Sequence, residues 1–374
     1  MELNRREWLR TTALAGGFTL LNGFSSIKPL TEEEKLKFNP RKLSNPIRLS
    51  SNENPYGPSQ RVRNAVKNAF NDGCRYPYAY ADELAYMLAK KHGVAPESII
   101  ITGGSTEGLK IAGITFTADG GEIIAAKPTF LAMMQYAEMW GANINWVPVD
   151  KNMGYDLEEI EKRITNKTKM VFLCNPNNPT STLLPADTLV DFCTSVSKKT
   201  IVFSDEAYYE YIEDPNYPSM VELVKKGKNV VVSKTFSKVY GMAGMRIGYL
   251  IAKPELAQII RRNVVAMSNV YAIEGAKEAL RDKAFFKFSL EKTKEAKQLI
   301  YATLNHLELP YVKSSTNFIF FKSGKNIDIL GKQMLDKGVR IGRAFPPFYD
   351  WCRISTGTIE EVVAFNKALI SVYS

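Results

Sequence analysis

The middle of the chain alternates short apolar runs with stretches of helical periodicity. Five runs are apolar, mostly β-branched and no longer than six residues: 98–102, 121–125, 169–174, 200–204 and 229–233. Runs of this kind are typical of buried parallel strands, and the helical stretches between them would cover the sheet. The pattern therefore predicts an α/β domain built on a largely parallel sheet.

Each predicted strand is followed at once by a polar or glycine-rich cluster. The clusters occupy residues 103–106, 127–130, 175–179, 205–206 and 234–238. Ligands of open α/β sheets bind outside the carboxyl ends of the strands. We therefore expect the functional site where these clusters meet.

The pattern changes after about residue 253. Long charged helices with Lys and Glu four residues apart are followed by predicted strands at 317–321 and 339–342 and a last helix from residue 360. This predicts a smaller α+β domain. The extended segment 47–58 has too few apolar residues for a core of its own, so we expect it to pack on that domain. The predicted divisions are 1–27, 28–60 (packing on the small domain), 61–260 (large domain) and 261–374 (small domain).

Length and composition agree with two packed regions in an ordinary globular protein. The 374 residues exceed the ~250–300 residues that one core supports. No apolar run approaches the ~18 residues of a membrane span. The net charge of +10 comes from interspersed acidic and basic residues, which favours a solvated basic surface over a nucleic-acid site. The four cysteines form no CxxC pair and there are only two histidines, which argues against a metal site. The small number of histidines also argues against imidazole acid-base catalysis, so a Lys, a Tyr or a carboxylate is expected to transfer any proton.

The N-terminus resembles a twin-arginine export signal. Arg5 and Arg6 precede a weakly hydrophobic stretch over residues 13–21. Trp8 stands where such signals usually carry Phe, and no clean small-x-small cleavage site follows. We expect residues 1–27 to direct export to the periplasm, with an amphipathic first helix and a cytoplasmic location as the alternative.

Two lysines and an arginine follow the last predicted strand of the sheet. A lysine among apolar groups and hydroxyls has a lowered pKa and forms a Schiff base with an aldehyde, and either Lys234 or Lys238 has that setting. Arg246, eight residues after Lys238, suits a phosphate. Further phosphate donors are the hydroxyls of Thr235 and Ser237 and the backbone amides of residues 103–106 at a helix start.

Other polar residues at the strand ends complete this picture. Asp205 ends an apolar strand, where a cation such as a protonated pyridine nitrogen would stabilise the carboxylate. Tyr208 follows three residues later, Asn178 lies in a Pro-Asn-Asn-Pro-Thr turn, and Phe130 has a ring able to stack on an aromatic ligand. Each residue alone is explained as a turn former or core residue, so only the combination indicates a site.

Seven ordered motifs resemble those of the fold-type I pyridoxal-phosphate aminotransferases, and within them the histidinol-phosphate aminotransferase-like group. They occupy residues 52–58, 75–77, 103–107, 175–180, 204–208, 235–238 and 353–355. The resemblance spans nearly all of the chain after the signal. It implies an aspartate aminotransferase-like fold with a mostly parallel seven-stranded sheet, a smaller α+β domain, and pyridoxal 5'-phosphate as cofactor.

The resemblance also implies a role for each matching residue. Lys238 would form the Schiff base, Asp205 would partner the pyridine nitrogen, and Tyr208 and Asn178 would partner the ring hydroxyl. The remaining implied contacts are Phe130 stacking on the ring; Ser105, Thr106, Thr235, Ser237 and Arg246 on the phosphate; Tyr76 reaching the phosphate from a neighbouring subunit; Arg353 on the substrate carboxylate; and Tyr56 and Asn52 near the substrate. The site thus implies a homodimer with shared active sites.

Two departures from the family pattern stand out. Ser181 replaces the usual glycine of Asn-Pro-Thr-Gly, which should confine that turn to conformations that a non-glycine residue tolerates. Gly342 takes the position of a second arginine found in some relatives, and Arg343 follows it. Arg340 and Arg343 are both candidates for that arginine, and we take Arg343 as a substrate-binding residue.

The implied function is ping-pong transfer of an amino group between an amino acid, or a similar amine, and a 2-oxo acid. Histidine synthesis belongs in the cytoplasm, so an export signal favours a donor other than histidinol phosphate, with histidinol-phosphate aminotransferase proper as the alternative. A related amino-acid phosphate decarboxylase, which uses the same cofactor, is a further alternative. A non-catalytic ligand-binding protein of the same fold is disfavoured because Lys238 is retained. A dinucleotide-dependent dehydrogenase is also disfavoured, because residues 103–108 lack the GxGxxG spacing of a dinucleotide site.

Overall fold

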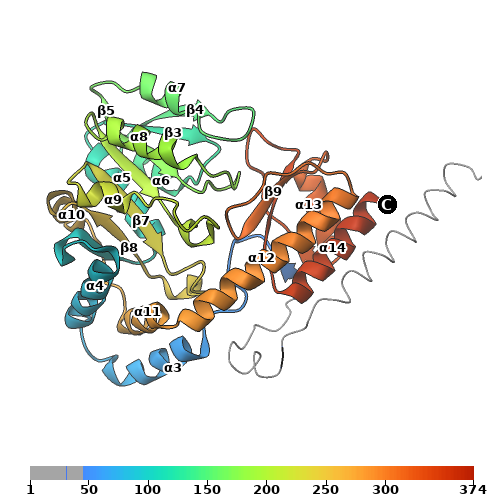
Figure 1. Ribbon diagram of the computed structural model, residues 1–374, viewed down its shortest axis with the longest axis horizontal. Helices are drawn as coiled ribbons and strands as arrows, with labels where there is room; N and C mark the ends of the chain where they lie inside the picture. The colour runs from blue at the N-terminus through green and yellow to red at the C-terminus, as the bar shows by residue number, and fades with distance from the viewer. Residues whose placement is uncertain (1–30, 32–44) are drawn as a thin grey trace, which may run out of the picture.

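One seven-stranded sheet forms the centre of the molecule (Figure 1). The structure, a computed structural model, describes Thr31 and residues 45–374. The strand order is β2-β8-β7-β6-β5-β3-β4, and all neighbours are parallel except β8, which is antiparallel to β2 and β7. The strands are β2 Ile99–Thr102, β3 Glu122–Lys127, β4 Asn143–Pro148, β5 Thr168–Cys174, β6 Ile201–Asp205, β7 Val230–Thr235 and β8 Gly248–Ala252. The predicted α/β fold with a mostly parallel sheet is confirmed.

Helices cover both faces of this sheet. Side chains alternate between its faces, so that Val171 and Leu173 of β5 enter one core while Met170 and Phe172 enter the other. The first core contains residues of α4 Tyr78–His92, α7 Leu157–Lys162, α8 Ala186–Val196, α9 Val221–Lys225 and α11 Val270–Arg281. The second contains residues of α5 Ser105–Thr117, α6 Ala132–Glu138 and α10 Pro254–Arg261. Helix α3 Gln60–Asn68 packs on α11.

The C-terminal lobe, residues 283–374, has a separate core. Strands β9 Phe318–Lys322 and β11 Trp351–Ser355 pair antiparallel, and three helices pack against them: α12 Lys283–His306, α13 Ile327–Asp336 and α14 Ile359–Tyr373. A capping box, in which Thr358 and Glu361 bond each other's backbone amides, begins α14. The last helix was predicted from residue 360, one residue late.

A short parallel pair joins the segment 45–58 to this lobe. Strand β1 Ile47–Arg48 pairs with β10 Val339–Arg340, and the Ser355 amide donates to the Leu49 carbonyl at 2.9 Å. The strand predicted at 339–342 is only two residues long, as is its partner β1. Beyond it, the backbone at Gly342 lies close to β11, where a Cβ would be 2.5 Å from the Arg353 carbonyl oxygen. Short 3-10 helices complete the fold at Ala69–Asp72, Pro96–Ser98, Tyr209–Tyr211 and Ala243–Met245.

All five predicted strands of the central sheet are present, and β4 and β8 were missed. β4 lies at the sheet edge and mixes exposed polar with apolar residues, so it lacks a continuous apolar run. β8 is buried throughout and meets the same apolar criterion as the other five strands. Among the described residues, no helix combines the length and apolar character that crossing a membrane requires. The predicted signal, residues 1–27, lies outside the described residues.

Candidate active site

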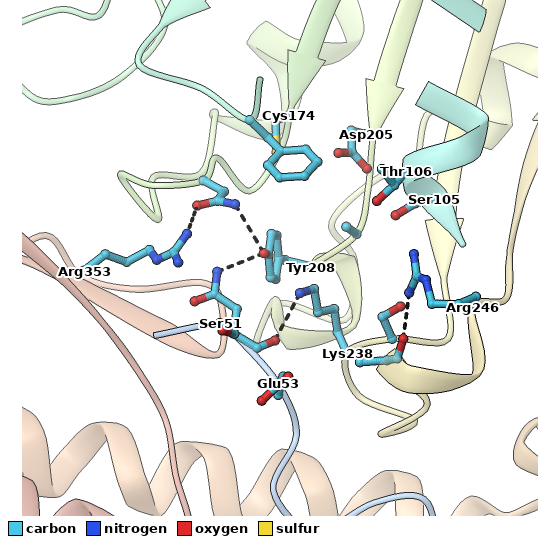
Figure 2. Close-up of a pocket in the computed structure, with 16 residues that line it drawn as sticks. Ser51, Glu53, Ser105, Thr106, Cys174, Asp205, Tyr208, Lys238, Arg246 and Arg353 are labelled. Carbon is cyan, nitrogen blue, oxygen red and sulfur yellow. Dashed lines mark hydrogen bonds between the residues drawn. The ribbon is translucent and has the colours of Figure 1, made fainter. Parts of the chain in front are cut away.

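A cavity of about 240 Å³ lies where β5, β6 and β7 end (Figure 2). The predicted residues that line it are Asn52, Ser105, Thr106, Phe130, Asn178, Asp205, Tyr208, Ser237, Lys238, Arg246 and Arg353. Strand ends, the start of α5, the segment 45–58 and β11 all contribute to its wall. The polar clusters that follow separate strands in the sequence therefore meet at one edge of the sheet.

The two candidate lysines have different surroundings. Lys238 lines the cavity, where its Nζ donates to the Asn52 carbonyl at 3.1 Å. Burial, together with the Arg353 charge, lowers the pKa of Lys238 to about 8. Lys234 is buried outside the cavity wall and pairs with Glu206 at 2.8 Å. Burial lowers the pKa of Lys234, but the Glu206 carboxylate and its neighbours outweigh that effect, so the pKa is raised. Lys238 can therefore supply a free amine, whereas Lys234 is a paired cation.

Asp205 ends β6 at the wall of the cavity. Its Oδ1 is buried and has no hydrogen-bond partner within the described part of the chain. Burial raises the pKa of Asp205 to about 7. A buried carboxylate oxygen without a partner is stabilised by a cation or a hydrogen-bond donor that enters the cavity.

Two amides converge on the Tyr208 hydroxyl. Asn52 Nδ2 donates to Tyr208 Oη at 3.0 Å, and Asn178 Nδ2 does so at 3.5 Å. Burial raises the pKa of Tyr208, so the hydroxyl stays protonated. Because Oη accepts both bonds, its own hydrogen is available to an acceptor in the cavity. Figure 2 draws both hydrogen bonds as dashed lines that end at the hydroxyl of Tyr208.

The start of α5 and the Arg246 side chain form an anion site. Gly104, at φ 84, precedes the first residue of α5, Ser105. Arg246 itself adopts a left-handed φ of 54, and its Nη2 lies 3.5 Å from the Gly103 carbonyl. A helix N-terminus beside a guanidinium group suits a phosphate. Thr235 does not line the cavity, but its Oγ1 accepts from the Ser237 amide at 3.0 Å and so orders the turn.

Arg353 presents a buried guanidinium to the opposite side of the cavity. Its Nη1 donates to Asn178 Oδ1 at 2.7 Å and its Nη2 to the Ser50 carbonyl at 2.7 Å. Its Nε is buried without a partner, and no carboxylate pairs with Arg353 among the described residues. Burial lowers the pKa of Arg353 to about 10, so it remains a cation at neutral pH. Arg353 and Arg343 contact the same Phe345 ring, at 4.8 and 4.5 Å from its centroid.

Several predicted residues lie away from the cavity. Tyr56 is buried, its Oη accepts from the Ile359 amide at 3.1 Å, and it orders the start of α14. Tyr76 is 82% exposed and borders a surface hollow beside Tyr271. Arg343 is exposed and Nη1 donates to the Ala344 carbonyl at 2.8 Å. Arg340, at the end of β10, is also exposed.

The turn at Ser181 takes the conformation that glycine favours. Ser181 has φ 60, and its Oγ donates to the Thr180 carbonyl at 2.6 Å. The left-handed region is narrow but open to residues other than glycine, at a cost of roughly 1–2 kcal/mol. The turn that carries Asn178 therefore keeps a left-handed residue at position 181, although that residue is serine and not glycine.

Five residues in the wall were not predicted: Ser51, Glu53, Cys174, Ala207 and Ala243. Glu53 bonds Arg48 Nη2 through both carboxylate oxygens at 2.7 Å, and its place in the Asn-Glu-Asn-Pro motif was the available signal. Cys174 ends β5, and burial raises the pKa of its thiol, so the thiol stays protonated. Its position at a strand end was also visible in the sequence.

The cavity fits pyridoxal phosphate in its donors and its charges. The unpartnered Asp205 oxygen suits a protonated pyridine nitrogen, and Lys238 offers an amine to the aldehyde. Gly104 leaves room for Arg246, since a Cβ there would collide with the guanidinium, and this guanidinium stands beside the amides of α5. The three requirements of the cofactor, namely a carboxylate, an amine and an anion site, are met in one cavity.

Comparison with known proteins agrees with this site. The model of the family aminotransferase class I and II matches residues 44–369. A histidinol-phosphate aminotransferase of Caldicellulosiruptor saccharolyticus is 37% identical, with 88% of this chain and 92% of the relative covered. One from Halalkalibacterium halodurans is 36% identical, with 88% and 90% covered. The solved histidinol-phosphate aminotransferase of Sinorhizobium meliloti in complex with pyridoxal-5'-phosphate is 27% identical, with a TM-score of 0.81 and 94% and 96% covered. The chain therefore belongs to the aminotransferase class I and II family and is a pyridoxal-phosphate-dependent aminotransferase.

Proposed function

We propose that this chain transfers an amino group between an anionic amine and a 2-oxo acid in two half-reactions, with Lys238 as the catalytic lysine. One observation carries the proposal: a lysine with a lowered pKa, a buried carboxylate with an unpartnered oxygen and an unpaired arginine share one cavity. The donor product leaves before the acceptor binds, which gives ping-pong kinetics.

Each residue of the cavity has a distinct task in this proposal. Bound pyridoxal phosphate supplies an electron sink for the charge that develops at the substrate Cα. Asp205 keeps the pyridine nitrogen protonated, and Tyr208 and Asn178 bind the ring hydroxyl. Lys238 Nζ would take the proton from the substrate Cα and deliver it to the cofactor carbon that carried the aldehyde oxygen, and a pKa of about 8 suits a general base near neutral pH.

The remaining cofactor contacts surround the ring and the phosphate. Phe130 would stack on the ring, because it lines the same cavity as Asp205. The phosphate is held by Ser105, Thr106, Ser237 and Arg246, with Thr235 ordering the turn before Ser237.

Substrate recognition depends on Arg353. Its buried charge lacks a carboxylate partner among the described residues, so we propose that an anionic group of the amine completes it. Asn52 lines the same cavity, Arg343 contacts the Phe345 ring that Arg353 also contacts, and Tyr56 accepts from the Ile359 amide at the start of α14. The names of the relatives make histidinol phosphate the first donor to test beside ordinary amino acids.

We also propose that the active enzyme is a homodimer, in which Tyr76 of the neighbouring subunit reaches the phosphate. Support comes from exposed aromatic side chains in one stretch of this chain: Phe70, Tyr76, Tyr78 and Tyr86. Sedimentation of the holoenzyme tests the dimer. Mixing Lys238→Ala and Tyr76→Ala chains should recover activity in hybrid dimers, whereas two additive, inactive populations would contradict a shared site.

Residues 1–27 are proposed as a twin-arginine-type export signal. The Arg5-Arg6 pair before a weakly hydrophobic stretch supports it. Cell fractionation of the full chain, with an Arg5→Lys/Arg6→Lys control, tests the location. An exported enzyme would favour a donor outside histidine synthesis.

Borohydride trapping tests the catalytic lysine. Reduction of the holoenzyme should attach the cofactor to the peptide containing Lys238, and Lys238→Ala should abolish both the adduct and turnover. Lys234→Ala serves as the matched control and should still form the adduct. Attachment at Lys234 would reassign the nucleophile.

A donor screen on the purified holoenzyme then separates the rival reactions. Amino exchange with 2-oxo acids supports the proposal, carbon dioxide release would identify a decarboxylase, and loss of optical activity a racemase. If the cofactor binds and none of these reactions occurs, the chain is a ligand-binding protein.

A further inference from the structure

A buried ion pair stands directly behind Asp205 and has no part in the function described so far. Lys234 Nζ lies 2.8 Å from Glu206 Oε2, and the two side chains are only 4% and 3% exposed. Neither residue lines the active-site cavity. Buried charges are costly, so an ion pair at this depth calls for a reason.

The sheet register places this pair beside the catalytic groups. Asp205 of β6 is the register partner of Ser233 of β7, and the Glu206 amide donates to the Ser233 carbonyl at 2.9 Å. Glu206 follows the last residue of β6, and Lys234 is the next residue of β7. Lys238 follows Lys234 by four residues, just after β7 ends. The pair therefore joins the end of β6, which carries Asp205, to the part of β7 that leads to Lys238.

Glu206 is held in a form that favours its negative charge. Its Oε2 accepts from Ser219 Oγ at 2.7 Å, and its Oε1 accepts from the Met220 amide at 2.8 Å. Hydrogen bonds of this kind stabilise a carboxylate. The Glu206 carboxylate, next in sequence to Asp205, opposes a second negative charge there and so contributes to the raised pKa of Asp205.

Lys234 is the cation that compensates Glu206. Its Nζ also lies 4.0 Å from the centroid of the Tyr209 ring. The other charged groups near Lys234 are Glu210 and Lys91. His92 bonds Tyr249 Oη at 2.9 Å, and burial and the nearby lysines lower its pKa to about 3, so it carries no charge.

We propose that Lys234 is a positioning residue that acts through Glu206: by compensating the Glu206 carboxylate, it keeps Asp205 ionised for the pyridine nitrogen of the cofactor. The inference rests on the proposed role of Asp205. It assigns the buried pair an electrostatic task at the active site in addition to joining two strands.

Nuclear magnetic resonance of holoenzyme loaded with 15N-labelled pyridoxal phosphate tests this directly, because the pyridine nitrogen shift reports its protonation. Lys234→Met should lower the pH at which this nitrogen loses its proton and weaken cofactor affinity about tenfold, equivalent to a change of one unit in the Asp205 pKa. Lys234→Arg, which keeps the charge, should match the wild type. The double variant Glu206→Gln/Lys234→Met, which removes both charges, should restore both measurements to within about threefold of wild type.

Other outcomes overturn the inference. An unchanged nitrogen shift in Lys234→Met would show that Asp205 does not depend on Lys234. A double variant as impaired as Lys234→Met would show that the pair only joins the strands. If Lys234→Met does not fold, Glu206→Gln carries the test: an uncompensated Lys234 should keep the nitrogen protonated to higher pH than in wild type, and an unchanged or lower pH would refute the proposal.

The proposed function fails in a different way. Absence of a borohydride-trapped adduct at Lys238 in the wild type would remove the function itself. An adduct at Lys238 in every variant, with no change at the ring nitrogen, would remove only the role of Lys234.

Discussion

Lys238 should react with the cofactor aldehyde at neutral pH far faster than an ordinary lysine. With a pKa of about 8, roughly one tenth of Lys238 is free amine at pH 7, against about one part in 3,000 for a lysine at 10.5. Only the free amine attacks an aldehyde. The structure thus predicts about 300 times more free amine at pH 7 than an ordinary lysine has, and this excess arises from burial and from the Arg353 charge.

Stopped-flow absorbance on apoenzyme mixed with pyridoxal phosphate measures this rate between pH 6 and 10. The rate should rise about tenfold per pH unit and level off near pH 8. Lys238→Ala provides the baseline. A rate that still rises steeply at pH 9 would refute the argument, because Lys238 would then have an ordinary pKa.

The same lowered pKa makes the stability of the apoenzyme depend on pH. Because Lys238 binds its proton less tightly in the folded state, the unfolded state holds more protons between about pH 8 and 10.5. The contribution of Lys238 to the free energy of unfolding should therefore rise with pH through this window. Urea unfolding of the apoenzyme and of Lys238→Met at pH 7 and 10 measures this contribution. The free energy of unfolding of the wild type should rise relative to that of Lys238→Met between pH 7 and 10. An unchanged difference between the two free energies would contradict the linkage.

Three further substitutions test the geometry around the cavity. Arg353→Lys keeps the charge but loses the guanidinium fork, so KM for an anionic donor should rise about tenfold or more with little change in kcat; an equal loss in kcat would show a role in the chemical step. Gly104→Ala, at φ 84 and against the Arg246 guanidinium, should weaken cofactor affinity in a fluorescence titration, and an unchanged Kd would contradict the anion site. Gly342→Ala places a Cβ 2.5 Å from the Arg353 carbonyl and should cost about 1–3 kcal/mol in denaturant unfolding, whereas the control Gly331→Ala, in an open position on α13, should be neutral or stabilising.

Patterning predicted that the candidate site lies at the carboxyl ends of the parallel strands. The parallel strands were visible as apolar runs, and their carboxyl ends had to meet at one edge of the sheet, so the sequence alone could place Asn178, Asp205 and Lys238 together. The strand β4 escaped because edge strands combine polar and apolar residues.

The sequence could not predict which side chains contact each other or at what distance. The pairing of Lys234 with Glu206 depends on the register of β6 and β7, and the contact between Gly342 and the Arg353 carbonyl depends on how the C-terminal lobe folds back. The shared contact of Arg343 and Arg353 with Phe345 likewise arises from residues that only the tertiary fold brings together. Composition and periodicity carry no information on such contacts.

The segment 45–58 connects Arg353, the proposed substrate-binding residue, to Lys238, the proposed catalytic lysine, through hydrogen bonds. The backbone amide of Asn52 donates to Ser355 Oγ, and Ser355 Oγ donates to Asn52 Oδ1, both at 2.8 Å. Arg353 donates to the Ser50 carbonyl. These hydrogen bonds hold the segment 45–58 against β11. The same segment supplies the Asn52 carbonyl that accepts from Lys238 Nζ. If Arg353 binds the anionic group of the donor as proposed, a shift of Arg353 would reach the Lys238 amine through the backbone from Ser50 to Asn52, and a donor without an anionic group would cause no such shift.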